Sequence, residues 1–123
     1  MPAPRPYPEL FLRVFLTEAG MIGPGKAALL EGIARHGSIS AAGREMGMSY
    51  KRAWSLVETM NAMFARPLVE SARGGPGGGR AALTTTGREV LALYRRIEAD
   101  AAAAAAPALA ALRRLQADRS GGE

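Results

Sequence analysis

The chain has 123 residues, no cysteine, 48% hydrophobic and 22% charged residues, and a formal net charge of +5. These values fit one ordinary domain. The lack of cysteine excludes a disulfide framework, and the hydrophobic content excludes a disordered chain. A membrane protein is excluded because no apolar stretch approaches the roughly 18 residues that a bilayer requires. The proline-rich start has no signal-peptide pattern, so a cytoplasmic location is expected. Residues 44–80 carry six bases and three acids, +3 of the +5, which favours a polyanionic partner.

The N-terminal third predicts a strand followed by a helix. Residues 1–8 contain four prolines and are expected to be disordered. ELFLRVFL (9–16) is rich in β-branched and aromatic residues and predicts a strand, and TEAGMIGPG supplies turn signals. Apolar residues then recur at helical spacing, Pro24 suits a first turn, and Gly37 suits the position after the last turn. A helix over roughly 24–36 is therefore expected.

The next stretch, SISAAGREMGMSYKRAW, contains two further helix starts. Ser40 is expected to cap a helix of about two turns that Gly47 ends, and Ser49 to cap a longer amphipathic helix. The predicted buried stripe of this second helix is Ala53, Val57, Met60 and Phe64. A short helix, a tight turn and a longer helix make a helix-turn-helix, whose second helix begins with Lys51 and Arg52.

The remaining sequence predicts a hairpin and a long helix. LVES and AALT are the expected strands, and the glycine-rich segment at 73–80 joins them as the wing of a winged helix. Thr86 with Glu89 forms a capping box for the last helix, and Thr84 is an alternative start. Pro107 should kink or break that helix. The alanine-rich segment 99–111 is interpreted as part of a dimerising or linking helix.

The expected fold class is mainly α (α+β), a winged helix-turn-helix with a short β-hairpin wing and a long C-terminal helix. Residues 9–86 are assigned to the DNA-binding domain, 87–116 to the dimerisation or linker helix, and 117–123 to a disordered tail.

Residues that carry catalysis are scarce. The chain has no cysteine and only one histidine, His36. This histidine stands at the end of a predicted helix, and the favourable interaction of its side chain with the negative end of the helix dipole explains its position. No Cys, His and carboxylate cluster has metal-ligand spacing. An enzyme is not expected, and neither a metal nor a cofactor is predicted.

Two other features have alternative interpretations. The glycine-rich loop resembles a phosphate cradle, but no lysine follows it and it joins two strands, so a passive loop or a nucleic-acid contact through Arg73 and Arg80 is favoured. Tyr50 and Trp54 are candidates for stacking on single-stranded bases. Trp54 lies next to the predicted buried stripe and is assigned to the core, whereas Tyr50 is left open.

The basic residues after Ser49 are the strongest functional signal. Cations near a helix N-terminus oppose the helix dipole, so Lys51 and Arg52 gain no stability there. An anionic ligand explains them better than a solvated helix end does.

A family resemblance supports this interpretation. GSIS, GMSYKRAW and GGPGGGRAALT are the most specific pieces of a similarity, over about residues 9–100, to the DNA-binding domain of the molybdate-dependent regulator ModE, which is related to the LysR-type winged helix-turn-helix. The resemblance implies homodimers that read palindromic operators. The family's full-length regulators continue into a C-terminal molybdate-binding module that this sequence does not resemble, so the resemblance does not extend to a molybdate response.

The function expected from the sequence is sequence-specific binding of double-stranded DNA by a transcriptional regulator, with a protein-docking winged helix as the alternative. By analogy with the family, the reading helix begins at Ser49 and the wing lies at 73–80. The predicted DNA-binding residues are Ser38, Ser40, Ser49, Tyr50, Lys51, Arg52, Ser55, Thr59, Arg73 and Arg80.

Overall fold

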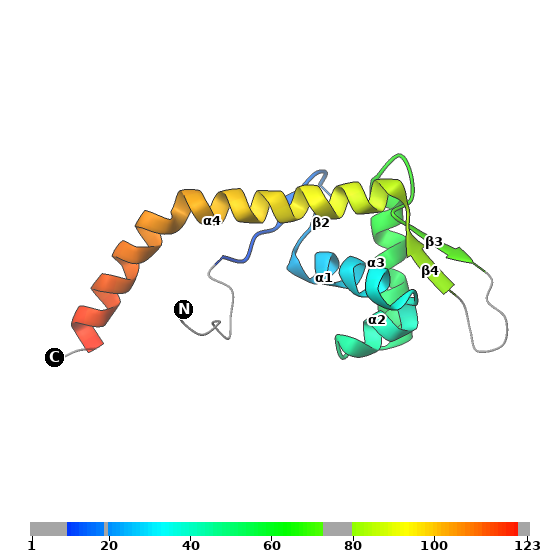
Figure 1. Cartoon of the computed structure of the whole chain (residues 1–123), viewed down its shortest axis with the longest axis horizontal. Helices are drawn as coiled ribbons and strands as arrows, with labels where there is room; N and C mark the ends of the chain where they lie inside the picture. The colour runs from blue at the N-terminus through cyan, green and yellow to red at the C-terminus, as the bar shows by residue number, and fades with distance from the viewer. Residues whose placement is uncertain (1–9, 19, 73–79, 121–123) are drawn as a thin grey trace. The chain divides into compact units, whose positions relative to one another are not determined.

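A computed structural model describes residues 10–18, 20–72 and 80–120 (Figure 1). The elements in chain order are β1 (Val14–Phe15), β2 (Met21–Ile22), α1 (Pro24–His36), α2 (Ile39–Glu45), α3 (Tyr50–Met63), β3 (Val69–Ala72), β4 (Arg80–Leu83) and α4 (Thr85–Ser120). The chain divides into two units, Phe11–Tyr94 and Met1–Leu10 with Arg95–Glu123. The unit Phe11–Tyr94 holds every element from β1 to β4 and the start of α4. The predicted winged helix-turn-helix with a long C-terminal helix is confirmed.

The first helix has the predicted bounds. Pro24 occupies the first turn of α1, where its missing N–H costs no hydrogen bond. Gly37 ends the helix with a left-handed φ of 67°, and its N–H donates to the Ile33 carbonyl at 2.8 Å. Only glycine adopts this conformation cheaply, so the turn into α2 is fixed by the sequence.

The start of α2 differs from the prediction. The cap is Ser38, whose Oγ accepts a hydrogen bond from the Ala41 N–H at 3.0 Å, and Ser40 is an exposed residue in the first turn. Both serines satisfy the local capping rule, and burial decides between them. Starting the helix after Ser38 places Ile39 inside the helix and buries it together with Ala42. The prediction of Ser40 as the cap is therefore wrong by two residues.

The turn between α2 and α3 depends on glycine at two positions. Gly47 has a φ of 75°, and the Met48 N–H folds back to the Gly43 carbonyl at 2.9 Å. A Cβ on Gly43 would lie 2.8 Å from the Cβ of Ala53, so the two helices approach too closely for any side chain there. The helix-turn-helix angle is thus set by small residues.

Helix α3 is built as predicted. The Ser49 Oγ accepts from the Arg52 N–H at 3.1 Å and caps it. Ala53, Val57 and Met60 are buried, as their spacing requires. Phe64, the predicted end of the stripe, is half-buried.

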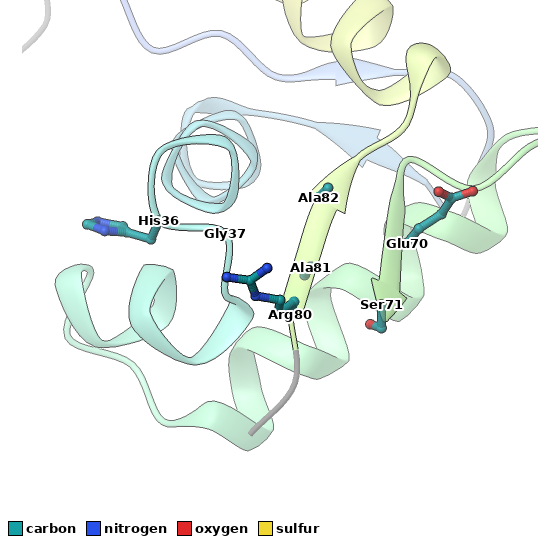
Figure 2. Close-up of a pocket in the computed structure, with 7 residues that line it drawn as sticks. All are labelled: His36, Gly37, Glu70, Ser71, Arg80, Ala81 and Ala82. Atoms are coloured by element: carbon teal, nitrogen blue, oxygen red, sulfur yellow. The ribbon is translucent and has the colours of Figure 1, made fainter. Parts of the chain in front are cut away.

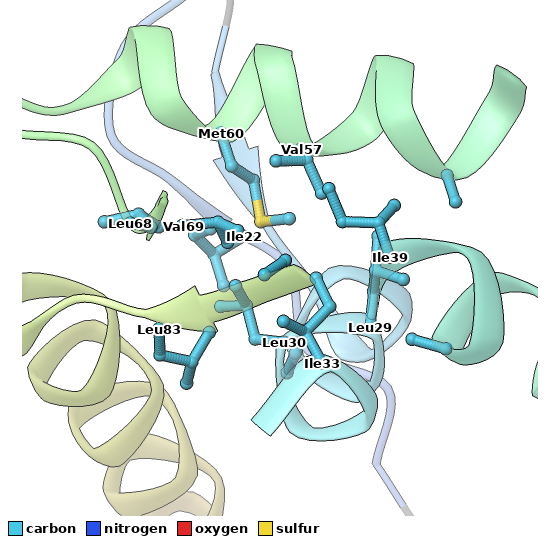
Figure 3. Close-up of a cluster of buried hydrophobic side chains, with 14 of the residues drawn as sticks. Ile22, Leu29, Leu30, Ile33, Ile39, Val57, Met60, Leu68, Val69 and Leu83 are labelled. Carbon is cyan, nitrogen blue, oxygen red and sulfur yellow. The ribbon is translucent and has the colours of Figure 1, made fainter. Parts of the chain in front are cut away.

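The core of the unit Phe11–Tyr94 lies between α1, α2, α3 and the hairpin. Figure 3 shows side chains from these elements converging in one cluster. Its fully buried large members are Leu29, Leu30, Ile33, Met60 and Leu68. The exposed residues at the start of α3 therefore belong to a helix whose opposite face is packed into this core.

The strand prediction for 9–16 holds only in part. Within the described part of that range, pairing is confined to Val14 and Phe15, which face Ile22 and Met21. The partner strand lies in a segment that was predicted to be a turn. The paired residues of this partner strand end at Ile22, two residues before α1 begins at Pro24.

The wing is an antiparallel hairpin in which Val69 faces Leu83 and Ala72 faces Arg80. The two strands agree with the prediction to within one residue, and the tip at 73–79, with Arg73, lies outside the described residues. The Ala81 N–H donates to the Gly37 carbonyl at 3.0 Å. This bond ties β4 to the turn between α1 and α2.

Asn61 joins the end of α3 to the hairpin. Its Oδ1 accepts from the Leu68 and Val69 N–H groups at 2.8 and 3.1 Å, and its Nδ2 donates to the Val69 carbonyl at 3.2 Å. Nothing in the sequence pattern distinguished this residue.

We expect Asn61→Ala to lower the free energy of unfolding by about 2 kcal/mol, because it leaves half-buried backbone groups without partners. Urea unfolding followed by circular dichroism measures this. Asn61→Asp keeps the acceptor oxygen and should lose less. An alanine variant within about 0.5 kcal/mol of the wild type would refute the role given to this side chain.

The last helix starts at the alternative cap. The Gly87 N–H donates to Thr84 Oγ1 at 2.9 Å, and that hydroxyl donates to the Pro67 carbonyl at 2.7 Å. The capping box at Thr86 is wrong, since that residue already lies inside α4. Buried Tyr94 donates its hydroxyl to the Leu12 carbonyl at 2.7 Å. The helix continues through Pro107 and changes direction in its orange part (Figure 1), as a kink at proline requires.

Candidate nucleic-acid interface

The exposed start of α3 carries the predicted reading residues. Tyr50, Lys51, Arg52, Ser55 and Thr59 are all exposed, as is the cap Ser49. Within the described residues neither Lys51 nor Arg52 forms an ion pair. Two cations thus remain uncompensated at the positive end of a helix dipole, where they repel it and are free to bind an anion.

The serine and threonine hydroxyls at this helix differ in whether they already form hydrogen bonds within the protein. Ser49 Oγ accepts the capping bond, and Thr59 Oγ1 donates to the Ser55 carbonyl at 3.0 Å. Ser55 lies four residues after Lys51, so the two share one face of the helix. That face combines the Lys51 cation with the Ser55 hydroxyl, which makes no hydrogen bond among the described residues.

Lys51 and Arg52 lie on different sides of α3, because successive residues are about 100° apart around a helix. Arg52 lines a pocket together with Arg13, Lys26 and exposed Phe11. The Lys26 Nζ donates to the Met21 carbonyl at 2.9 Å. Three cations, one from the segment before β1, one from α1 and one from α3, therefore gather at one side of α3. Sequence reasoning missed Arg13 and Lys26, since no spacing rule connects them to Arg52.

The wing residue Arg80 stands beside the helix-turn-helix. It lines a pocket with His36, Gly37 and Glu70. In Figure 2 its side chain leans from β4 toward the turn at Gly37, whereas Glu70 points away from it on β3. Ser38, in the same turn, uses its Oγ as the cap of α2. The wing and the helix-turn-helix thus meet at a face that bears an exposed guanidinium.

A cluster of charges lies at the ends of α1 and α2. The Glu45 carboxylate accepts a hydrogen bond from Arg35 Nη2 and lies 3.4 Å from His36 Nε2. Hydrogen bonding by His36 and then by Arg35 holds the pKa of Glu45 below its ordinary value. His36 therefore has a carboxylate partner, Glu45, in addition to the helix end that the sequence assigned to it.

This cluster makes a pH-dependent contribution to stability. Because the pKa of Glu45 is lower in the folded chain, the contribution is present above the ordinary carboxyl pKa and is lost as the pH falls through the folded pKa. The group is exposed, so the effect is small. We expect the melting-temperature advantage of the wild type over Glu45→Gln to shrink from about pH 6 to about pH 3. An advantage that stays constant over this range in thermal unfolding would contradict the ion-pair role.

The tryptophan prediction is wrong. Trp54 is 45% exposed rather than part of the core, and Tyr50, one turn before it, is 56% exposed. Trp54 follows buried Ala53 by one position and so points about 100° away from the core stripe. The two aromatic rings stand beside the exposed cations.

Other kinds of site find no support in the described part of the chain. No group of three or more His, Cys, Asp or Glu residues there is placed to hold a metal ion. Among the helices described, none combines the length and apolar character needed to cross a membrane.

A helix-turn-helix with an exposed basic second helix and an adjoining hairpin defines the winged helix-turn-helix class. Residues 26–88 match the bacterial regulatory helix-turn-helix proteins of the lysR family, and the chain belongs to this family. Proteins of this family are DNA-binding transcriptional regulators rather than enzymes, which confirms that part of the prediction.

Named relatives agree with the resemblance to ModE. The chain is 48% identical over 91 residues to the molybdenum-pterin-binding protein MopA of Rhodobacter capsulatus, covering 72% of this chain and 34% of the relative. It is 41% identical over 86 residues to the DNA-binding transcriptional dual regulator ModE of Escherichia coli K12, covering 70% and 33%. For the transcriptional regulator ModE of Haemophilus influenzae the identity is 41% over 90 residues, covering 73% and 35%. The chain spans about a third of the length of the curated relatives that it matches.

Proposed function

We propose that the protein is a homodimeric transcriptional regulator that binds a palindromic double-stranded operator in the bacterial cytoplasm. The observation that carries the proposal is the pair of exposed cations at the tip of α3, Lys51 and Arg52, which have no acidic partner among the described residues. In this proposal α3 enters the major groove, where lysine and arginine bind guanine edges or phosphates. Ser49, Tyr50, Ser55 and Thr59 add contacts along the same helix.

The flanking elements bind the sugar-phosphate backbone in this proposal. Ser38 and α2, with its exposed Ser40, lie along one strand, and Arg80 and Arg73 reach the adjacent phosphates. The basic pocket of Arg13, Lys26 and Arg52 adds positive potential next to the reading helix. Phosphate contacts of this kind position a protein on the duplex, whereas base contacts select the sequence.

Dimerisation is supported by apolar side chains that α4 leaves exposed. Leu93, Ile97, Leu112 and Leu115 are between 43 and 68% exposed, which suits burial against a second copy. Two copies would place their reading helices about 34 Å apart, one turn of the duplex.

The salt dependence of binding tests the proposal against the alternative of a docking module. Neutralising about six phosphates gives a slope near −5 in a plot of log affinity against log salt concentration. A gel shift with random genomic fragments at several salt concentrations measures it. Weak binding that is insensitive to both salt and sequence would favour protein docking.

A further inference from the structure

Tyr50 and Trp54 form an exposed aromatic pair on the reading helix. They are four residues apart, so they lie on one face and about 6 Å apart along the helix axis. The other large apolar residues of α3 are at least half-buried. Exposure of these two rings therefore does not follow from the packing of the helix.

The surroundings of the aromatic pair favour a nucleic acid over a protein partner. Lys51 directly follows Tyr50, Ser55 directly follows Trp54, and both side chains are exposed. Glu58 is the only acidic residue in α3, and it lies one turn beyond Trp54. A protein-docking patch is expected to be contiguously apolar, whereas the strip of two rings runs directly beside a second exposed strip that carries a cation, Lys51, and a hydroxyl, Ser55.

The major groove offers one apolar group for such rings to contact, the C5-methyl group of thymine. We propose that Tyr50 and Trp54 determine operator sequence by contacting thymine methyl groups, an inference that rests on the proposed function and goes beyond it. The two rings are separated by about 6 Å and base pairs by about 3.4 Å, so a helix lying along the groove contacts methyl groups about two base pairs apart.

Removing single methyl groups from the DNA tests the proposal. In a duplex recovered by selection from a random library, each thymine is replaced in turn by deoxyuridine, and the Kd is measured. Loss of one buried methyl should weaken binding about fourfold at two positions in each half-site, roughly two base pairs apart. In Trp54→Ala one of these effects should vanish, and in Tyr50→Ala the other, whereas Trp54→Phe should retain sensitivity. Thermal unfolding verifies that each variant is folded.

Intrinsic fluorescence gives a second readout. Trp54 is the only tryptophan in the chain, so its emission reports on this face directly. We expect the selected duplex to quench and shift the emission at the same concentration at which it binds in a gel shift.

The outcomes separate the two proposals. Salt-dependent duplex binding without deoxyuridine sensitivity and without a change in Trp54 emission would overturn the methyl contacts and leave DNA binding intact. Stronger quenching by single strands than by the duplex would also overturn them, in favour of base stacking. No duplex binding by the wild type would overturn the proposed function itself.

Discussion

Replacing both Lys51 and Arg52 with alanine is expected to reduce operator affinity by about 100-fold or more, because each side chain contributes roughly one factor of ten through base or phosphate contacts. The melting temperature should stay the same or rise slightly, since both cations oppose the dipole of α3 and neither makes an ion pair within the described residues. Gel shift or fluorescence anisotropy measures the affinity, and circular dichroism measures the melting temperature.

A matched control separates local contacts from net charge. Arg66 and Arg114 are exposed and are not among the predicted DNA-binding residues, so Arg66→Ala with Arg114→Ala removes the same two charges. This control should lose affinity only modestly. Equal losses in the two double variants would mean that general electrostatic attraction, rather than the tip of α3, accounts for binding.

Gly87→Ala is expected to give the largest loss of stability among the glycine-to-alanine substitutions of the described residues. A Cβ at this position would lie 2.1 Å from the Leu68 carbonyl oxygen, and that backbone cannot rotate away as a side chain would. The same turn holds the Thr84 cap of α4 and the start of β3. We expect the free energy of unfolding to fall by about 3 kcal/mol, a drop in melting temperature on the order of 10 °C.

Gly25→Ala is the control for this prediction. Gly25 lies in the first turn of α1 and is exposed, and a Cβ added there would meet no other atom within 4 Å. The substitution should be neutral or stabilise by about 0.5 kcal/mol, because alanine has the higher helix propensity. If the two variants melted within about 2 °C of each other, the close approach of α4 to the hairpin would not be the constraint proposed for Gly87.

Local rules were sufficient for much of the fold. The bounds of α1 and the start of α3 follow from a proline, a glycine and a serine within one or two turns of each helix end. The buried stripe of α3 follows from its period. The exposure of Lys51 and Arg52 could therefore be predicted before any tertiary contact was known.

Features that depend on tertiary contacts could not be predicted in the same way. Ser38 and Ser40 obey the same capping rule, and only the burial of Ile39 selects Ser38. Trp54 borders the core stripe, so its exposure depends on which side of α3 the other elements cover. Asn61 bonds backbone groups seven and eight residues away, a pairing that no periodicity encodes.

We propose above all that the basic tip of α3 reads a specific double-stranded sequence. Selection of bound sites from a random duplex library by the full chain tests it most directly. We expect a palindromic consensus whose half-sites are centred about 10 base pairs apart. Recovery of no enriched sequence, or of the same consensus by the Lys51→Ala, Arg52→Ala variant, would contradict it.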